Sequence, residues 1–265
     1  MKDNLKLYCV TNKPLPDLEK TNLKLAGVGK DKFSNKYIDT SVNINIFHKE
    51  EYYSELTFHY WYWKNLLSKE NYEWVGFCQK RRFWIKKDSE NKDINKKNIL
   101  NHLLTEPEND WKNINAILCN PINVYGAKKI KLIKRGWRNI LSDPSLLFNK
   151  KESIKVHFDM HHTYGTLDKA ISVMNKNDQE DFKKYVNQNN FYNPHIMFIS
   201  KPKLIDRWFS ALFSWLEKCE ELFGFENLKG YDQKRLYAFL AERYMSFWFR
   251  KYSEFKEHPW IFLDN

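Results

Sequence analysis

The sequence predicts an α/β protein, in which strands alternate with helices. Two features indicate this class. Short apolar runs that end in polar turns have the pattern of buried strands, whereas the second half contains long stretches with apolar residues at every third or fourth position. With 265 residues, 42% of them apolar, the chain has enough material for one large packed core. We therefore expect a single domain over residues 1–265.

Four segments have the pattern of sheet strands. The first ends in the polar turn Thr11–Pro14, and α/β proteins bind ligands at the edge where such strands end. The second continues into Gln79 and the cationic run Lys80–Arg82, which indicates an anion site at its carboxyl end. The expected strands are Leu5–Val10, Trp74–Cys78, Ala116–Cys119 and His195–Ile199.

Three segments have helical periodicity. Tyr53–Leu67 is apolar on nearly every side, which predicts a largely buried helix. Leu204–Leu222 carries apolar residues three or four positions apart, and Gly224 is placed to end that helix. The last helix is expected to begin at Asp232 as N-cap and to run towards Arg250, which puts Arg235 and Glu242 on one face.

Nothing in the sequence indicates passage across a membrane. The longest apolar runs are far shorter than the ~20 residues that a spanning helix needs. The charged start, Met1–Val10, lacks the apolar centre of a secretory signal, so we expect a cytoplasmic protein. The four cysteines are scattered without a Cys-x-x-Cys pair, so we expect buried reduced thiols rather than zinc ligands. They are Cys9, Cys78, Cys119 and Cys219.

The formal charge of +11 raises the question of a nucleic-acid or membrane partner. Basic residues cluster with aromatic ones at Lys80–Lys87 and at Lys128–Arg138, although the lysine-rich composition explains part of this. No recognisable nucleic-acid-binding motif is present, so we expect no nucleic-acid partner. The second cluster and the carboxyl-terminal helices are candidates for peripheral membrane contact.

Six segments of the chain carry a long, spaced pattern. They are Val10–Pro14, Asn45–Thr57, Tyr60–Asn65, Val75–Arg82, Met197–Ile199 and Phe239–Arg243. This pattern resembles one family of capsular and exopolysaccharide glycosyltransferases that includes galactofuranosyltransferases and was long described as a domain of unknown function. The longest match lies between residues 45 and 82, and the resemblance covers most of the chain. Five positions depart from the family pattern, namely Asn12, Phe47, Glu50, Gln79 and Lys80.

The resemblance implies a single GT-A-like nucleotide-sugar-binding domain, with a central mixed sheet flanked by helices and a helical carboxyl-terminal part. Many such enzymes hold a divalent metal with an Asp-x-Asp pair, which this sequence does not contain. The strand that would deliver the pair ends instead in Arg81 and Arg82, and guanidinium groups bind phosphate bidentately. We hypothesise that these arginines replace the metal in stabilising the departing nucleoside diphosphate; a solvated surface pair is the alternative.

The resemblance and the strand ends together give the candidate donor site. No metal ligands and no required cofactor are predicted, and manganese or magnesium is the less favoured alternative. The expected donor-binding residues are Thr11, Lys13, Gly29, Lys49, Gln79, Arg81 and Arg82.

A transferase also needs a general base for the acceptor hydroxyl. Asp159, in a polar and ring-rich stretch, and Glu242, on an otherwise aromatic helix, are the two candidates. An ion pair with Arg235 or Arg243 is an equal alternative for Glu242, and hydrogen-bonding or surface roles are the stronger alternative for the two adjacent histidines. The expected acceptor- or sugar-binding residues are Glu55, Lys64, His161, His162, Asn193, His195 and Arg235.

The resemblance implies a hexosyltransferase that moves a sugar onto a growing capsular or other surface polysaccharide, with inversion of configuration. The first expectation for the donor is galactofuranose or N-acetylgalactofuranosamine on uridine diphosphate (UDP), and a UDP-pyranose is the alternative. The expected acceptor is a glycan or lipid-linked glycan at the inner face of the cytoplasmic membrane. A non-catalytic scaffold of a polysaccharide-assembly complex is the competing class.

Overall fold

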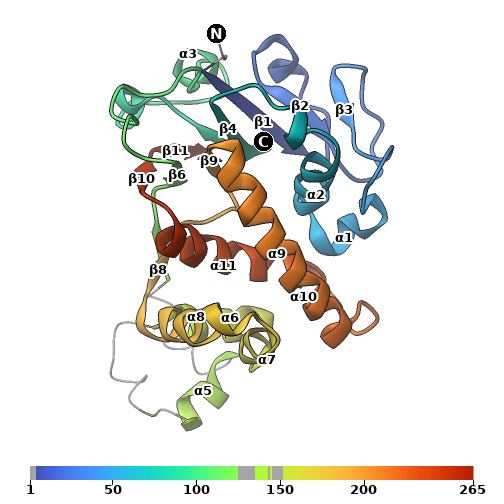
Figure 1. Cartoon of the computed structure of the whole chain (residues 1–265), viewed down its shortest axis with the longest axis vertical. Coiled ribbons are helices and arrows are strands. Elements are labelled where there is room, and N and C mark those ends of the chain that lie inside the picture. The colour runs from blue at the N-terminus through green and yellow to red at the C-terminus, as the bar shows by residue number, and fades with distance from the viewer. Residues whose placement is uncertain (1–3, 125–134, 143, 145–151, 265) are drawn as a thin grey trace. The chain divides into compact units, whose positions relative to one another are not determined.

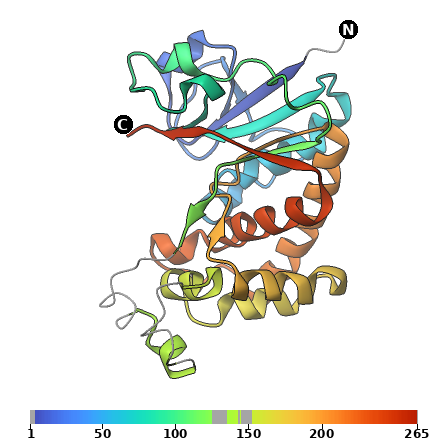
Figure 2. The ribbon, with the colours of Figure 1, turned by 90° about the vertical axis from the view of Figure 1, so that its left-hand side faces the viewer.

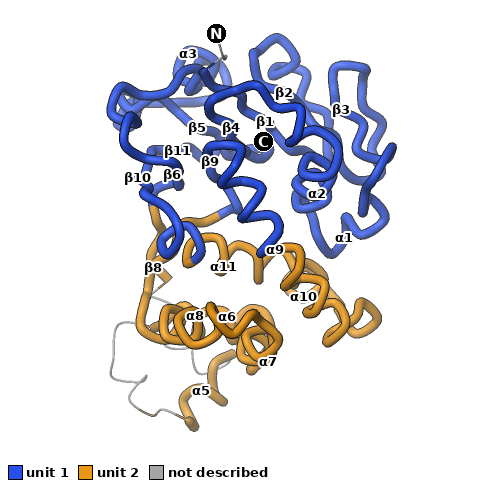
Figure 3. The backbone as a smooth tube through the Cα atoms, in the orientation of Figure 1, with its two compact units in different colours: residues 1–120, 195–211, 248–265 blue, residues 121–194, 212–247 orange. Residues whose placement is uncertain are grey.

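A computed structural model describes residues 4–124, 135–142, 144 and 152–264 of the chain. They divide into two compact units (Figure 3). Unit 1 comprises residues 1–120, 195–211 and 248–265, and unit 2 comprises residues 121–194 and 212–247. The chain therefore passes into unit 2 and back twice, although the sequence shows no linker at these points.

Unit 1 contains a mixed β-sheet in which the described strands follow the order β10-β6-β9-β4-β1-β2-β3, with β5 and β11 attached beside β4. The pairs β1–β2, β1–β4, β2–β3 and β6–β10 are parallel, whereas β9 is antiparallel to both β4 and β6. The strands are β1 (Leu5–Thr11), β2 (Lys24–Gly27), β3 (Tyr37–Asp39), β4 (Trp74–Gln79), β5 (Arg82–Trp84), β6 (Ala116–Cys119), β9 (Phe198–Ser200), β10 (Phe255–His258) and β11 (Trp260–Phe262).

The central strands β1 and β4 lie side by side and are buried on both faces (Figures 1 and 2). This burial explains why both segments are predominantly apolar, with Lys6 at the less buried start of β1 as the charged exception. Gly76 occupies the middle of β4, where a Cβ atom would lie 2.5 Å from Leu7 Cδ2 and 2.6 Å from Ile199 Cγ1. Glycine is therefore required for the close approach of the β1 and β9 side chains.

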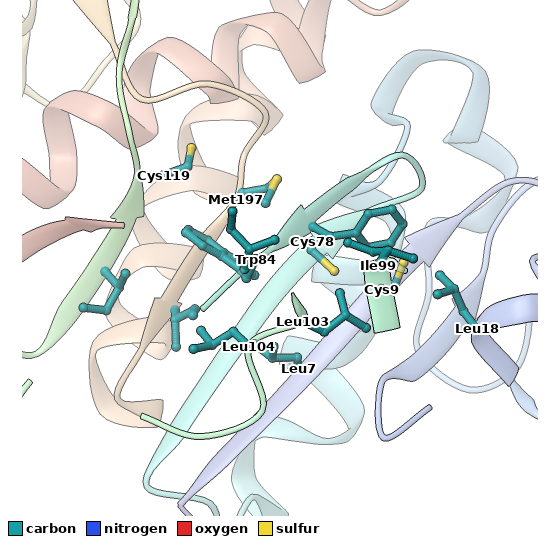
Figure 4. Close-up of a cluster of buried hydrophobic side chains, with 14 of the residues drawn as sticks. Leu7, Cys9, Leu18, Cys78, Trp84, Ile99, Leu103, Leu104, Cys119 and Met197 are labelled. Carbon is teal, nitrogen blue, oxygen red and sulfur yellow. The ribbon is translucent and has the colours of Figure 1, made fainter. Parts of the chain in front are cut away.

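The two faces of the sheet carry different cores. One face holds a mixed cluster of aliphatic, sulfur-containing and aromatic side chains that includes Leu7, Cys9, Cys78 and Trp84 (Figure 4). The other is aromatic, with Phe77 ring centroids 5.9 Å from Tyr8, 6.2 Å from Phe58 and 5.0 Å from Phe198. All four cysteines are buried and free, as the sequence predicted.

The helices of unit 1 depart from the predicted pattern at one point. The expected helix over 53–67 is interrupted at Ser54, whose φ of 52° is incompatible with a continuous helix. The observed elements are η1 (Pro16–Lys20), η2 (Phe47–Lys49), α1 (Glu50–Tyr53), α2 (Leu56–Asn65), η3 (Leu67–Lys69), η4 (Lys87–Ser89) and α3 (Ile99–His102). The strand expected at 195–199 is also shorter, because His195 and Ile196 have φ values of 74° and 52° and β9 begins at Phe198.

Unit 2 is mostly helical and contains a short β-pair. Two long helices, α9 (Pro202–Phe223) and α11 (Leu236–Tyr252), each have residues in both units. Gly224 follows α9 with a φ of 59°, which confirms the predicted helix end. The last helix does not begin at Asp232, because a short helix precedes it and the chain bends at Arg235. The remaining elements are β7 (Ile122–Asn123), α5 (Trp137–Ser142), α6 (Ile154–His162), α7 (Thr166–Ser172), α8 (Lys176–Gln188), β8 (Phe191–Tyr192) and α10 (Tyr231–Lys234).

Candidate functional site

The carboxyl ends of four parallel strands of unit 1 meet at one edge of the sheet. These ends are Thr11, Gly27, Asp39 and Gln79, because β3, β2, β1 and β4 all run in the same direction. The antiparallel strand β9 begins at this edge, so the segment that starts at His195 is also brought here. Open α/β sheets bind ligands at such an edge, which makes it the first candidate site.

The ends of β1 and β2 hold Thr11, Lys13 and Gly29. The backbone N–H of Lys13 donates to Thr11 Oγ1 at 3.1 Å, and the N–H of Val28 donates to the Thr11 carbonyl at 2.9 Å. Gly29 has a φ of 82°, and a Cβ atom there would lie 3.3 Å from the Glu50 carboxyl carbon. The turn thus buries the threonine hydroxyl and leaves the Lys13 side chain exposed.

A hydrogen-bonded group at the end of β4 joins residues from distant parts of the chain. The Gln79 side-chain amide donates to a Glu55 carboxylate oxygen and to the His195 carbonyl. Its own oxygen accepts from Arg82 Nη1 at 3.3 Å. The structure therefore brings together Gln79, Arg82, Glu55 and His195.

The backbone of this edge is strained. Arg81, in the turn between β4 and β5, has a φ of 70°, which is uncommon for a residue with a side chain. His195 and Ile196 also have positive φ, and Ile196 is β-branched, for which this region is especially unfavourable. Such strain is concentrated at functional sites in proteins.

The two arginines after β4 have incompletely satisfied charge. Both guanidinium groups lie 5.3 Å from the ring centroid of Phe262, and Arg81 Nη1 is 3.8 Å from Asp264, whose side chain is 82% exposed. Among the described residues, neither Nε atom has a hydrogen-bond partner, although both are buried. Lys80 donates to the Asn12 side-chain oxygen. Cations and unused N–H donors at a strand end are suited to bind a phosphate group.

A cavity of about 690 Å³ lies beside the ends of β2 and β3. Hydrogen bonds from the Ser41 hydroxyl at 2.6 Å and the Ser41 N–H at 2.9 Å lower the pKa of Asp39, so this carboxylate stays ionised at neutral pH. The cavity therefore offers aromatic surfaces and an anionic acceptor. It is lined by Gly27, Gly29, Lys30, Asp31, Phe33, Ser34, Asn35, Tyr37, Ile38, Asp39, Ser41 and Phe47.

The two predicted lysines of the helical segment lie in different settings. Lys49, at the end of η2, has its Nζ 5.7 Å from the Tyr53 ring centroid. Lys64 is exposed in the last turn of α2, and its Nζ lies 3.3 Å from the Trp63 ring centroid. Nine residues of helix, roughly 13 Å, separate it from Glu55, so these two residues are not brought together.

In unit 2, Asp159 lies within a polar environment. Its carboxylate is 3.0 Å from Lys155 Nζ and accepts from the Gly165 N–H at 3.1 Å. Burial raises the pKa of Asp159, against the opposing effect of the Lys155 charge. Asp159 and His161 both line a cavity at the end of α6, with residues of α5 and of the segment that leads into α10.

The two adjacent histidines have different surroundings. His162 is buried, stacks on Phe239 with ring centroids 4.0 Å apart, and its Nδ1 donates to the Asp232 carbonyl at 2.7 Å. Burial, assisted by the charge of Arg243, lowers the pKa of His162 to about 3, so the ring is neutral. His161 is partly exposed and its Nδ1 lies 2.9 Å from the His157 carbonyl.

The remaining predicted residues of unit 2 have structural partners. Glu242 forms an ion pair with Arg243, which is the alternative that the sequence left open. Arg243 is 2% exposed and lies 4.5 Å from the Tyr192 ring centroid. Asn193 is buried and accepts from the Ser246 hydroxyl at 2.8 Å. Arg235 lies 4.9 Å from the Tyr231 ring centroid.

Sequence reasoning missed several residues beside these groups. Asp39 follows directly from the rule that strand ends line the site, but β3 is too short to be recognised from its pattern. No sequence pattern indicated that Phe262 and Asp264 belong to the site, because the pairing of β11 with β5 is what brings them to Arg81. Of the second basic cluster, residues 128–134 lie outside the described part of the chain.

The fold and its edge define an α/β protein with a mixed sheet whose strand ends present cationic and hydrogen-bonding groups. The chain belongs to the family described as Domain of unknown function (DUF4422), which it matches over residues 6–254. No curated protein shows significant sequence similarity to it.

One solved structure has the same fold. It is the apo structure of WbbM, described as a bifunctional glycosyltransferase, which superposes with a TM-score of 0.72 at 20% sequence identity. The match covers 99% of this chain and 46% of the WbbM chain, so the chain spans about half the length of that protein. The predicted α/β fold with a central mixed sheet is thereby confirmed.

None of the helices in the described part of the chain is long and apolar enough to span a bilayer. Within the same residues, no group of three or more His, Cys, Asp or Glu side chains is arranged to hold a metal ion. That the chain requires no metal stays a prediction.

Proposed function

We propose that this chain is a glycosyltransferase that moves a sugar from a UDP donor onto a growing surface polysaccharide. The observation that carries the proposal is the pair Arg81 and Arg82, with buried, unpartnered Nε–H groups at the carboxyl end of a central strand. The family resemblance and the likeness in fold to a bifunctional glycosyltransferase support the class of reaction. Galactofuranose or N-acetylgalactofuranosamine is the proposed sugar, with inversion at the transferred carbon.

In this mechanism the charge that develops on the leaving UDP is stabilised by the guanidinium groups of Arg81 and Arg82. Gln79 fixes Arg82 from one side and is itself held by Glu55 and the His195 carbonyl. No metal is required in the proposal, because two permanent cations take the role that a divalent ion has in other transferases. The cavity beside β2 and β3, with Phe47 and Asp39, is proposed to hold the nucleoside.

The acceptor hydroxyl must lose its proton to a base as it attacks the sugar. We assign this role to Asp159 rather than Glu242. Asp159 lines a cavity, and the upward shift of its pKa makes it a better proton acceptor. Glu242 is committed to its ion pair with buried Arg243. A lipid-linked acceptor at the inner face of the cytoplasmic membrane is part of the proposal.

The test is UDP binding to the purified chain. Calorimetry and thermal unfolding measure this binding in the presence of EDTA or of manganese. We expect UDP to raise the unfolding temperature in EDTA, because a ligand that binds only the folded state stabilises it. The double variant Arg81→Gln/Arg82→Gln should bind UDP at least about tenfold more weakly, since two charge-assisted contacts are lost. Arg207→Gln, an exposed arginine of α9, is the matched control and should bind normally.

Two results would refute the donor assignment. One is UDP binding that requires manganese in the parent chain, and the other is equal affinity in the double variant and the control. Turnover with UDP-galactofuranose against UDP-galactopyranose then identifies the sugar, and the anomeric configuration of the product establishes the stereochemistry.

A further inference from the structure

The strongest unassigned feature of the chain is the cavity of about 460 Å³ in unit 2. It is formed by three chain segments that are far apart in sequence, at the start of α5, the end of α6 and the start of α10. Gln233 Nε2 donates to Thr163 Oγ1 at 3.1 Å, and His162 bonds the Asp232 carbonyl, so α6 and α10 are held together. The residues that line the cavity are Arg135, Trp137, Arg138, Asp159, Met160, His161, Thr163, Tyr164 and 229–233.

Three aromatic rings of this cavity are exposed to solvent. Trp137 is 50% exposed, Tyr164 39% and Tyr231 67%. A folded protein normally buries such large side chains, and a group of exposed aromatic residues around a hollow marks a binding site. Flat aromatic faces pack well against the C–H faces of sugar rings, so the shape of the rim suits a glycan.

Three cationic side chains line the cavity, against the two carboxylates of Asp159 and Asp232, so positive charge is in excess. Among the described residues, no carboxylate forms an ion pair with Arg135, Arg138 or Lys229. The negative charge of Asp159, in contrast, is already compensated by Lys155 at 3.0 Å. Cations without a carboxylate partner in a concave site favour an anionic ligand.

The cations and rings are arranged together. The guanidinium carbon of Arg138 lies 5.2 Å from the Trp137 ring centroid and 5.9 Å from that of Tyr164. A sugar stacked on either ring would therefore place its substituents within reach of Arg138. Neutral glycan binding would not require this side chain, whereas an acidic substituent would pair with it.

We propose that this cavity binds the acceptor, and that the acceptor is a glycan whose sugars carry negatively charged groups. The proposal rests on the function proposed above and adds the chemical class of its second substrate. Trp137 and Tyr231 stack on the sugar rings, while Arg138 and Lys229 pair with the acidic groups. Asp159, the proposed base, also lines this cavity.

The test measures glycan binding directly, without donor or turnover. Isothermal titration of the full chain compares α-1,4-linked tetragalacturonate with the neutral α-1,4-galactotetraose, in which hydroxymethyl groups replace the carboxylates. We expect tetragalacturonate to bind at least about tenfold more tightly at low salt, and this preference to shrink as salt screens the charges. Equal affinity for the two oligomers, tighter binding of the neutral one, or no binding of either would overturn the proposal.

Matched variants place the binding within the cavity. Lys229→Gln should weaken tetragalacturonate binding about fivefold or more. Lys183→Gln removes the same charge from an exposed position of α8 and should change it less than about twofold. Trp137→Ala should abolish the binding with an unchanged circular dichroism spectrum. Equal effects of Lys229→Gln and Lys183→Gln would place the ligand elsewhere and overturn the proposal.

Two further measurements distinguish this proposal from the proposed donor site and from a membrane-contacting surface. UDP titration of the same samples tests the donor site alone. If the parent chain binds tetragalacturonate but not UDP, the proposed transferase is refuted while the acidic-glycan site stands. If it binds UDP but not tetragalacturonate, only the acidic-glycan site is refuted. Sedimentation with anionic vesicles gives the third comparison. If Lys229→Gln lost vesicle binding while tetragalacturonate bound neither chain, the cavity would belong to a membrane-contacting surface and the inference would be wrong.

Discussion

Two regions of the chain contain arginines next to buried groups, but they balance charge in different ways. In unit 2, Arg243 is 2% exposed, is ion-paired with Glu242 and lies against the Tyr192 ring. At the sheet edge of unit 1, the one carboxylate that the described residues place near Arg81 is the exposed Asp264, at 3.8 Å, and Arg82 has a neutral amide. A buried arginine with a close carboxylate partner stabilises one arrangement of the chain, whereas a cation without a close carboxylate is available to a ligand.

The largest effect on stability is expected for a substitution of Glu242. The substitution Glu242→Gln leaves the buried charge of Arg243 without its partner. We expect the free energy of unfolding to fall by about 3 kcal/mol, measured by urea denaturation. Glu217→Gln, an exposed glutamate of α9, should leave stability nearly unchanged. A Glu242→Gln chain of normal stability that had lost transfer activity would instead identify Glu242 as the catalytic base and break the comparison.

The next largest effect is the loss of stability at acid pH, because each of the two units contains a buried neutral histidine. Burial lowers the pKa of His59 in unit 1 and of His162 in unit 2, each to about 3. Between pH 6.5 and about 3 the unfolded chain binds a proton that the folded one does not, so stability is complete above pH 6.5 and falls towards acid. The slope is about 1.4 kcal/mol per pH unit for each histidine.

His59→Phe isolates the unit 1 contribution. The ring lies among Phe77, Phe198 and Phe209, and its Nδ1 has no hydrogen-bond partner among the described residues. The phenyl ring should keep the packing and remove the protonation, so unfolding free energies measured at pH 7 and pH 5 should differ less than in the parent. The pH dependence of stability that remains in this variant comes from other buried groups, which include His162. An unchanged difference would show that His59 is protonated in the folded chain or accessible to water.

The smallest effect is expected for Asp264→Asn. This carboxylate is exposed and 3.8 Å from Arg81, so its removal should change the free energy of unfolding by less than about 0.5 kcal/mol. Because it competes with phosphate for the guanidinium, UDP should bind equally well or about twofold more tightly. Destabilisation comparable to that of Glu242→Gln would mean that Arg81 is a structural residue like Arg243.

The sequence by itself determined the elements whose pattern is set by local burial. The strands β1, β4 and β6 were predicted within one residue at their ends, because strands buried within a sheet are predominantly apolar. The end of α9 at Gly224 and the cationic turn after β4 were likewise visible, since both depend on residue types adjacent in the chain.

Only the tertiary structure decided which distant residues share a site. Gln79 and His195 meet because β9 runs antiparallel beside β4, and Glu55 reaches Gln79 from the start of α2; no local pattern encodes either contact. The breaks at Ser54 and Arg235 are backbone conformations that neighbouring segments impose on helix-forming sequence. Likewise, Glu242 and Arg243 are adjacent in every conformation of the chain, but their burial against Tyr192 exists only in the folded one, and burial is what makes an ion pair structural.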